Sequence, residues 1–436
     1  MKAKKRRFLA RAAVALVLAP LALFGSMLFF AKIESTKSGV HQRLMLPLLG
    51  IAHVKIPMTA GTGDAAAIPG RFDGPVVKMG TANSWSASWF CENRVLRQAG
   101  RGETLHISCA GQRHTFAIPQ KAQQDDAVVS MPDKLLVLSD IEGNAAFLNS
   151  ALSKLGVTAA SGEWNFGANR LVIAGDSVDR GSDVFAVLWR LHGLAAQARA
   201  AGGSVHVVLG NHEQYLLRGN TVKIHPEHLY ALEKMGGAAA AFAPDTVIGA
   251  WLRAQPVVVK AGRVVVTHGG ISSLVVQQGL TIAQLNTAMR RYWRGELVPT
   301  AELEAVLGFN GVTQYRGYFK AEEGKYAKAG DQDVVAALRS FDADTIVVGH
   351  SIVEKVSVLY DKKVYAINVN SNTSAPEALL FEGGVAKVVT AAPRALPEEE
   401  TERVARPINL LNGQDWQTLA RLTRRTRELS NLPSPF

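Results

Sequence analysis

Five short apolar runs between residues 134 and 351 each end in a polar loop, and this arrangement restricts the fold more than any other feature of the chain. Helix-like stretches separate several runs, for example residues 145–155 and 183–201, where Ser182 is a suitable N-cap. Apolar runs that alternate with helices indicate strands buried on both faces of a parallel or mixed sheet. The sequence therefore predicts an α/β fold. The segments read LLVLS-DIEGN, LVIA-GDSVDRG, VHVVL-GNHE, VVVT-HGGIS and TIVV-GHS.

Each of the five loops carries a side chain that suits a metal ion. Active residues in such folds gather at the carboxyl ends of the strands. Oxygen and imidazole donors without thiolate suit Mn, Fe, Zn or Mg rather than a structural zinc site. One loop of this kind means little, but five in succession predict a metal centre. The candidate ligands are Asp140, Glu142, Asp176, Asn211, His268 and His350.

Four of these blocks, GDSVDRG, GNHE, THGGIS and GHS, together resemble the calcineurin-like metallophosphoesterases. More narrowly, the chain is similar to the phosphoprotein phosphatase branch, which includes the bacterial and plant Shewanella-like phosphatases. The resemblance covers roughly residues 134–370. It implies a metallophosphoesterase β-sandwich flanked by helices, and a serine/threonine phosphatase-like enzyme that hydrolyses phosphomonoesters of small molecules or proteins.

The resemblance also implies two divalent metal ions, with Mn favoured and Fe, Zn or Mg as alternatives. Asp176 would bridge the ions because one carboxylate has two oxygens to share. Asp140 and His350 would complete the coordination of the first ion, and Asn211 and His268 that of the second. A hydroxide held between the ions would attack phosphorus in line with the leaving group.

The remaining implied roles concern the substrate. His212 would protonate the leaving oxygen, oriented by Asp179, and Arg180 would grip the phosphoryl oxygens. Asn211 would also face the substrate. A second arginine is expected between the last two blocks, and we prefer Arg316, because its aromatic and glycine neighbours suit a loop. The other candidates, which fit a solvated helix face, are Arg290, Arg291 and Arg294.

The first block departs from the family pattern, because Glu142 stands where the family has a metal-binding histidine. Glu142 can still bind metal and favour Mn or Mg over Zn. Alternatively it misses the metal and weakens the first site, or catalysis has been lost. Retention of the other catalytic positions favours an active enzyme. A nucleotide or dinucleoside polyphosphate hydrolase and a retired binding module remain the alternative functions.

The N-terminus predicts a membrane anchor. Residues 12–31 carry no charge, and twenty residues of helix span about 30 Å, the thickness of a bilayer core. We favour an uncleaved anchor over a removed signal peptide, with the N-terminus cytoplasmic and the catalytic domain in the periplasm. Most of the net charge of +11 lies before this segment, which argues against a nucleic-acid partner. The cations are Lys2, Lys4, Lys5, Arg6, Arg7 and Arg11.

Only two cysteines occur, Cys91 and Cys109, and polar residues 98–102 between them suggest a hairpin with the cysteines at its base. An oxidising compartment would let them form a disulfide, with two free thiols as the alternative. His225 and His228 are expected at surface positions, with substrate contact as the alternative. The expected segments are 1–31 (basic flank and anchor), 32–60 (connector), 61–130 (β-rich element), 134–390 (metallophosphoesterase domain) and 391–436 (charged helical tail).

Overall fold

The computed structural model describes residues 25–27, 29–48, 52–64, 66–119, 125–371, 373–394, 402–409 and 411–430. The chain divides into two compact units. The small unit comprises Met1–Pro69 and Glu398–Ser430, and the large unit comprises Gly70–Pro397 with Asn431–Phe436.

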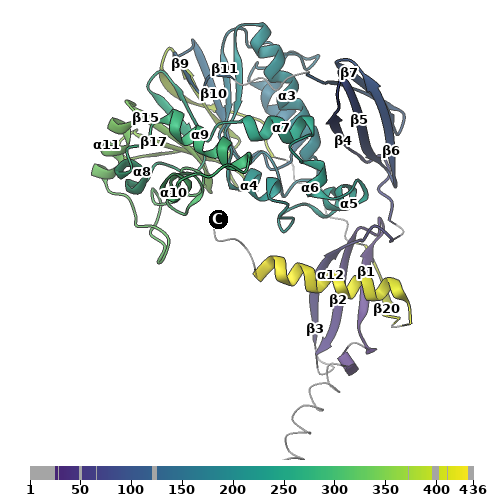
Figure 1. The fold of residues 1–436 in the computed structure, drawn as a ribbon. Helices are drawn as coiled ribbons and strands as arrows, with labels where there is room; N and C mark the ends of the chain where they lie inside the picture. Colours follow the sequence, from purple (N-terminus) through teal and green to yellow (C-terminus); the bar gives the residue numbers. More distant parts are fainter. Residues whose placement is uncertain are drawn as a thin grey trace, which may run out of the picture. The chain divides into compact units, whose positions relative to one another are not determined.

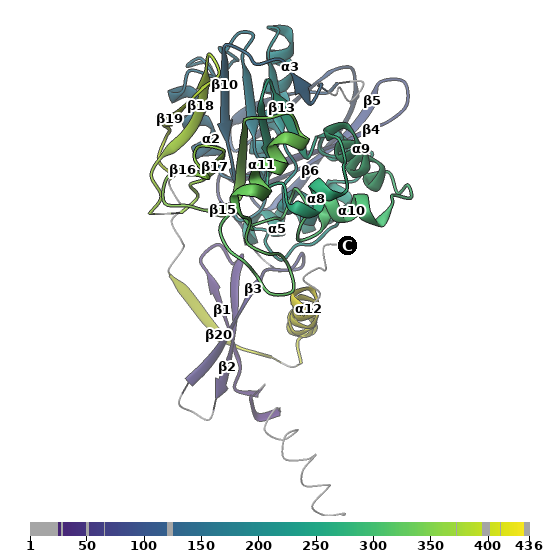
Figure 2. The same ribbon diagram turned by 90° about the vertical axis from the view of Figure 1, so that its left-hand side faces the viewer.

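Two mixed sheets form the centre of the large unit (Figure 1). The first has the order β12-β11-β10-β18-β19, with β10, β11 and β12 parallel and the β18–β19 hairpin at its outer edge (Figure 2). Its strands are β10 (Lys134–Leu138), β11 (Arg170–Ile173), β12 (Ser204–Val207), β18 (Glu377–Glu382) and β19 (Val385–Thr390). The second has the order β16-β17-β15-β14-β13-β9. Its strands are β9 (Val128–Val129), β13 (Val258–Ala261), β14 (Val264–Thr267), β15 (Thr345–Ile352), β16 (Ser357–Leu359) and β17 (Val364–Asn368).

The central strands are buried on both faces, as their continuous apolar runs predicted. Successive side chains of a strand point to opposite faces. Leu135 and Val137 of β10 therefore join a buried cluster with Val266 of the second sheet. The intervening Leu136 and Leu138 join a different cluster, which contains the flanking helices. This is the helix-flanked mixed α/β fold expected from the sequence.

Ten helices of the large unit lie among the described residues, and α2 and α3 follow the ranges that the sequence predicted. The N-cap of α3 is Asp183 rather than Ser182, and its side chain caps no helical N–H. Oδ1 of Asp183 instead lies 2.9 Å from Nη1 of Arg71. The helices are α2 (Ala145–Lys154), α3 (Val184–Ala200), α4 (Asn211–Leu217), α5 (Pro226–Lys234), α6 (Ala238–Ala241), α7 (Val247–Ala254), α8 (Ser273–Gln277), α9 (Ile282–Trp293), α10 (Thr300–Leu307) and α11 (Asp331–Ser340).

The β-rich element of the large unit packs against α3. Its strands are β4 (Phe72–Met79), β5 (Ser84–Cys91) and β6 (Arg94–Arg101) in one sheet, and β7 (Thr104–Cys109) with β8 (Gln112–Ala117) in a hairpin. Trp189 of α3 donates from Nε1 to the carbonyl oxygen of Pro75 at 3.0 Å, and its ring lies 5.1 Å from that of Phe116. The element therefore shares the core of the large unit.

The predicted disulfide joins Cys91 and Cys109, whose Cα atoms are 5.7 Å apart. The predicted position of the hairpin turn was wrong. Residues 98–101 continue β6, and the chain reverses earlier, at Glu92 and Asn93, where β5 pairs with β6. The local polar composition suggested a turn, but the pairing of Arg101 with Ser84 extends the strand. The disulfide thus links the three-stranded sheet to the β7–β8 hairpin.

Replacing Cys109 by serine is expected to lower the free energy of unfolding by about 3 kcal/mol, because the disulfide restricts the unfolded chain. Denaturant titration of the variant and of the wild type measures this loss. Wild-type protein treated with a thiol reductant should show the same lowered midpoint as the untreated variant. An unchanged midpoint in both samples would contradict a stabilising disulfide.

The small unit contains a four-stranded antiparallel sheet with the order β20-β1-β2-β3. Its elements are β1 (Lys32–Thr36), β2 (His41–Leu48), β3 (Ala52–Thr59), β20 (Arg403–Pro407) and α12 (Gly413–Ser430). Ile33, Leu44 and Met58 form its apolar cluster, against which Leu419 of α12 packs. Two hydrogen bonds of 2.8 and 2.6 Å join the guanidinium of Arg406 to Asp415.

Residues 32–60 differ from the expected connector, because most of them form β1, β2 and β3. The sheet that these strands form is completed by β20 from the expected C-terminal tail. Of the anchor predicted over residues 12–31, residues 12–24 and 28 lie outside the described residues. Within the described part of the chain, no helix combines the length and apolarity needed to span a membrane.

Candidate functional site

The loops that follow β10, β11, β12 and β14 meet each other and the end of β15. The backbone N–H of Asp140 donates to Gly175 at 2.9 Å, and that of Gly349 donates to His268 at 3.0 Å. Several non-glycine residues here have a positive φ, which costs about 1–3 kcal/mol each and persists where the surroundings fix it. Such strain concentrates at functional sites. The residues are Asp140, Glu142, Asp176, Asp179, Arg180 and His350, with φ between 51° and 66°.

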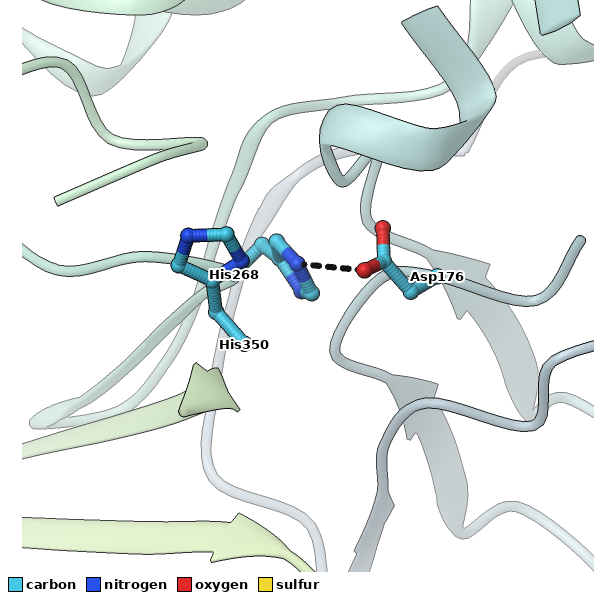
Figure 3. Close-up of side chains that lie close together, drawn as sticks. All are labelled: Asp176, His268 and His350. Carbon is cyan, nitrogen blue, oxygen red and sulfur yellow. Dashed lines mark ion pairs between the residues drawn. The ribbon is translucent and has the colours of Figure 1, made fainter. Parts of the chain in front are cut away.

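Three buried side chains, Asp176, His268 and His350, form the strongest candidate metal site (Figure 3). Each offers one ligand atom, and these atoms all lie within 4.8 Å of one another. Oδ2 of Asp176 lies 3.0 Å from Nε2 of His268, and the two imidazole rings have centroids 4.8 Å apart. We expected His268 and His350 at different ions. Both rings lie beside Asp176, the residue expected to bridge the two ions.

The surroundings of His268 prepare it to bind a cation. Its Nδ1 lies 2.7 Å from the carbonyl oxygen of Ala174, to which it donates. This bond leaves Nε2 directed toward Asp176, as a metal-ligating histidine requires. Nε2 is also 3.1 Å from Oδ1 of Asn211, so the predicted ligand Asn211 lies at the same place. Burial opposes a charge on the ring, but Asp176 outweighs it and raises the pKa of His268 to about 9 without a metal.

Asp140 and Glu142 border this cluster and are bound by other side chains. Oδ1 of Asp140 accepts a hydrogen bond from Asn368 at 2.8 Å. Oε1 of Glu142 lies 2.8 Å from Nη1 of Arg180, and Oε2 accepts from Nδ2 of Asn370. Burial, followed by the charge of Asp140, raises the pKa of Glu142 to about 8. The glutamate that replaces the family histidine therefore contacts the candidate phosphate-binding arginine.

The predicted acid and its partner are in contact. Nδ1 of His212 lies 2.9 Å from Oδ2 of Asp179, and both residues are buried. The backbone N–H of His212 donates to Oδ1 of Asp176 at 3.0 Å. Burial opposes protonation, but Asp176 and Asp179 outweigh it and raise the pKa of His212 to about 9. The imidazole can therefore hold a proton at neutral pH.

Arg316 also lies at the site. Its Nη1 donates to the carbonyl oxygen of His350 at 2.9 Å, and its Nη2 is 3.3 Å from Nδ1 of the same histidine. Arg291 and Arg294, two of the alternatives, instead pair with Glu296 on the surface. The third, Arg290, contacts Thr287 within α9 at 3.3 Å.

Sequence reasoning missed several residues that hold these loops. Glu213, within the GNHE block, accepts from the backbone N–H groups of Gly210, Asp176 and Ser177 at 2.8, 3.0 and 2.6 Å. Glu213 is fully buried although its side chain is acidic, and the sequence pattern did not indicate this burial. Arg394 donates to the carbonyl oxygen of Asp140 at 2.6 Å and lies 4.0 Å from the ring centroid of Phe147. Arg394, Asn368 and Asn370 belong to no recognisable motif.

His225 and His228 differ from each other in environment. His225 is partly buried and is the N-cap of α5, as a turn position predicts. His228 is fully buried, so its predicted surface position was wrong. Its Nδ1 lies 2.8 Å from Oδ2 of Asp73, a partner from the distant strand β4.

The family model described as calcineurin-like phosphoesterase matches residues 133–354, just over half of the chain. The chain belongs to the calcineurin-like phosphoesterases. The family predicted from the loop motifs is therefore confirmed.

This calcineurin-like phosphoesterase resembles a solved structure along almost all of that structure's length. A cold-active protein-tyrosine phosphatase of a psychrophilic Shewanella species is 30% identical, with a TM-score of 0.65, over 73% of this chain and 99% of that one. The Shewanella-like protein phosphatase 2 of Arabidopsis thaliana is 30% identical over 89 residues, 20% of this chain and 23% of the relative. An uncharacterized protein of Schizosaccharomyces pombe is 34% identical over 103 residues, 23% of this chain and 31% of the relative. The matches thus span less than a third of each curated relative.

Proposed function

We propose that this phosphoesterase is a metal-dependent phosphomonoesterase. The observation that carries the proposal is the Asp176–His268–His350 cluster directly beside the His212–Asp179 pair. The first group can hold a cation, and the second can hold a proton for a leaving oxygen. A retired binding module would have no need to keep both.

Divalent ions held by the cluster would polarise the phosphoryl group and supply an activated water. Arg180 and Arg316 would bind the phosphoryl oxygens, where their guanidinium groups offset developing negative charge. Asp179 holds Nδ1 of His212, so the transferable proton is at Nε2. The buried carboxylate of Asp179 at Nδ1 favours the protonated ring, from which Nε2 can donate that proton.

We further propose two ions, with manganese preferred. Asp140 and Glu142 lie beside the cluster and would add two carboxylates to a second position. Carboxylate and imidazole donors without thiolate favour Mn or Mg over a structural zinc ion. Arg180 and Asn370 both contact the carboxylate of Glu142. If Glu142 binds an ion, its carboxylate oxygens would have to serve the ion as well as these two side chains.

Phosphoproteins are the proposed substrates. The Arabidopsis relative is named a protein phosphatase and the Shewanella structure a protein-tyrosine phosphatase, which supports phosphotyrosine over the serine/threonine preference that we expected. The test compares Mn-dependent rates of the full chain on phosphotyrosine, phosphoserine and phosphothreonine peptides, p-nitrophenyl phosphate and dinucleoside polyphosphates. Phosphotyrosine peptides should be hydrolysed fastest. Faster cleavage of the dinucleotides would favour the anhydride hydrolase, and no cleavage of any substrate would refute a phosphatase.

Metal binding is expected to release protons and to strengthen as the pH rises from 6 to about 9. Without a metal, Glu142 has a pKa of about 8 and His268 of about 9, so both hold a proton at pH 7. Bound ligands must be deprotonated, and a higher pH therefore favours binding. Calorimetric Mn titrations in buffers of different ionisation enthalpy measure the release. Glu142→Gln should release fewer protons, and heats that do not depend on the buffer would contradict the expectation.

We also propose that the large unit lies outside the cytoplasm of the cell. The uncharged residues 12–31 and the Cys91–Cys109 disulfide support this, because disulfides persist in oxidising compartments. Protease added to intact spheroplasts should then cleave the protein. Protection from protease until the cells are lysed would refute this location.

A further inference from the structure

A buried arginine outside the family-matched region reaches the segment that follows the Asp179–Arg180 turn. Arg71 directly precedes β4, and only 8% of its side chain is exposed. Its Nη1 lies 2.9 Å from Oδ1 of Asp183, and its Nη2 donates to the carbonyl oxygen of Ser182. We propose that Arg71 is a positioning residue for the Asp179–Arg180 turn, an inference that rests on the proposed phosphatase function.

Asp73 fixes the guanidinium of Arg71 from the other side. Nη2 of Arg71 lies 2.7 Å from Oδ2 of Asp73, and the same oxygen contacts Nδ1 of His228 at 2.8 Å. The side chain of Asp73 is 2% exposed and that of His228 is fully buried. Charge-assisted hydrogen bonds between buried groups have defined geometry. Arg71 is therefore held in one orientation toward the turn.

The segment that precedes the helix of His228 also supports the turn. His228 lies in α5, and the segment just before α5 contains Lys223, whose carbonyl oxygen accepts the N–H of Arg180 at 2.9 Å. The ring of His228 packs edge-on against Phe185 of α3, with centroids 5.6 Å apart. The Arg71–Asp73–His228 contacts thus join the β-rich element to both segments that adjoin the turn.

The turn needs such support because its conformation is unfavourable. Asp179 and Arg180 have φ values of 66° and 53°. A left-handed conformation costs roughly 1–2 kcal/mol for a residue with a Cβ and persists only where the surroundings impose it. Ser182 and Asp183, which Arg71 binds, are the residues through which the turn enters α3. The backbone bonds that hold the turn run from Arg180 to Lys223, from Gly181 to Glu142 and from Asp183 to Gly143, each 2.9 Å.

A relaxed turn would displace two functional side chains at once. Asp179 contacts His212, and Arg180 is the candidate phosphate ligand. A misplacement of about 1 Å at a catalytic group can lower the rate roughly a hundredfold. Arg71 touches neither substrate nor the reacting atoms, so its effect passes through the turn.

The test is Arg71→Met in the full chain with Mn. We expect kcat to fall by about tenfold to a hundredfold, with the bound Mn per chain unchanged. Hydrogen exchange of residues 177–184 should become faster, while exchange of β10 stays as in the wild type. Added guanidinium should restore part of the activity of Arg71→Ala, because it can occupy the vacated position. Arg94→Met, at an exposed arginine of the same element, is the matched control.

A second variant keeps the test decisive if Arg71→Met does not fold. Asp183→Ala removes a partner whose side chain is 43% exposed and leaves the buried Arg71–Asp73 pair in place. It should also accelerate exchange of residues 177–184. Unchanged exchange together with kcat within about twofold of the wild type, in a folded variant, would overturn the inference. An inactive wild type would refute the proposed function, whereas the exchange data would still decide whether Arg71 orders the turn.

Discussion

Replacing Asp176 by asparagine is expected to remove the metal-dependent phosphatase activity. Oδ2 of Asp176 lies 3.0 Å from Nε2 of His268, and Oδ1 accepts the N–H of His212 at 3.0 Å. Asparagine keeps the size and one oxygen but lacks the negative charge that attracts a divalent ion. The variant should lose metal-dependent stabilisation of the transition state worth several kcal/mol. We therefore expect kcat to fall by a factor of roughly 10³ or more.

Steady-state hydrolysis of p-nitrophenyl phosphate with Mn measures this loss, and elemental analysis measures the bound metal. Asp245→Asn is the matched control, because Asp245 is exposed and pairs with Lys78 far from any proposed ligand. The control should keep wild-type rates and metal content. An Asp176→Asn protein that retains both would show that the cluster is not the catalytic metal site.

Replacing His212 by glutamine is expected to lower kcat by about 10² to 10⁴, the usual contribution of a general acid. Glutamine can still reach Asp179, so the turn keeps a hydrogen-bond partner for its carboxylate. What is lost is the ring proton at Nε2, which the carboxylate of Asp179 at Nδ1 favours. The loss should be greatest for leaving groups that need that proton.

A comparison of leaving groups measures this effect. p-Nitrophenolate departs readily without protonation, whereas the alkoxide of an alkyl phosphate does not. The ratio of wild-type to variant kcat should therefore be much larger for the alkyl ester. His106→Gln, at an exposed histidine of β7, is the control. Its kcat should equal that of the wild type on both substrates. An equal loss on both substrates would assign His212 a role other than proton donation.

The metal-site loops were predictable because each depends on local sequence. An apolar run that ends in GDSVDRG or GNHE specifies a buried strand and the turn that follows it, and parallel strands bring their carboxyl ends to one edge. The pattern therefore predicted a metal centre, and the family resemblance assigned Asp176 and His268 to it. The distances between their ligand atoms, and the closeness of the His268 and His350 rings, depend on how the two sheets pack.

Other contacts had no local signal. Asn370 and Arg394 reach the loop of Asp140 and Glu142 from more than two hundred residues away, where the sequence shows no motif. His228 was expected on the surface, whereas it is buried in contact with Asp73, a residue far away in the sequence. A carboxylate and an imidazole that form a hydrogen bond with each other can be buried together, because each satisfies the polar group of the other.

The four-stranded sheet of the small unit has a consequence for biosynthesis. β1 pairs with β20, from Lys32 opposite Pro407 to Thr36 opposite Arg403, although almost the whole chain separates them. Emerging domains fold in the order in which the ribosome makes them. The large unit can therefore fold before residues 403–407 have been synthesised. During that time the edge of β1 that later pairs with β20 is unpaired. Until translation reaches β20, that edge is open to chaperones or to other nascent chains, and a ribosome stalled upstream would leave it so.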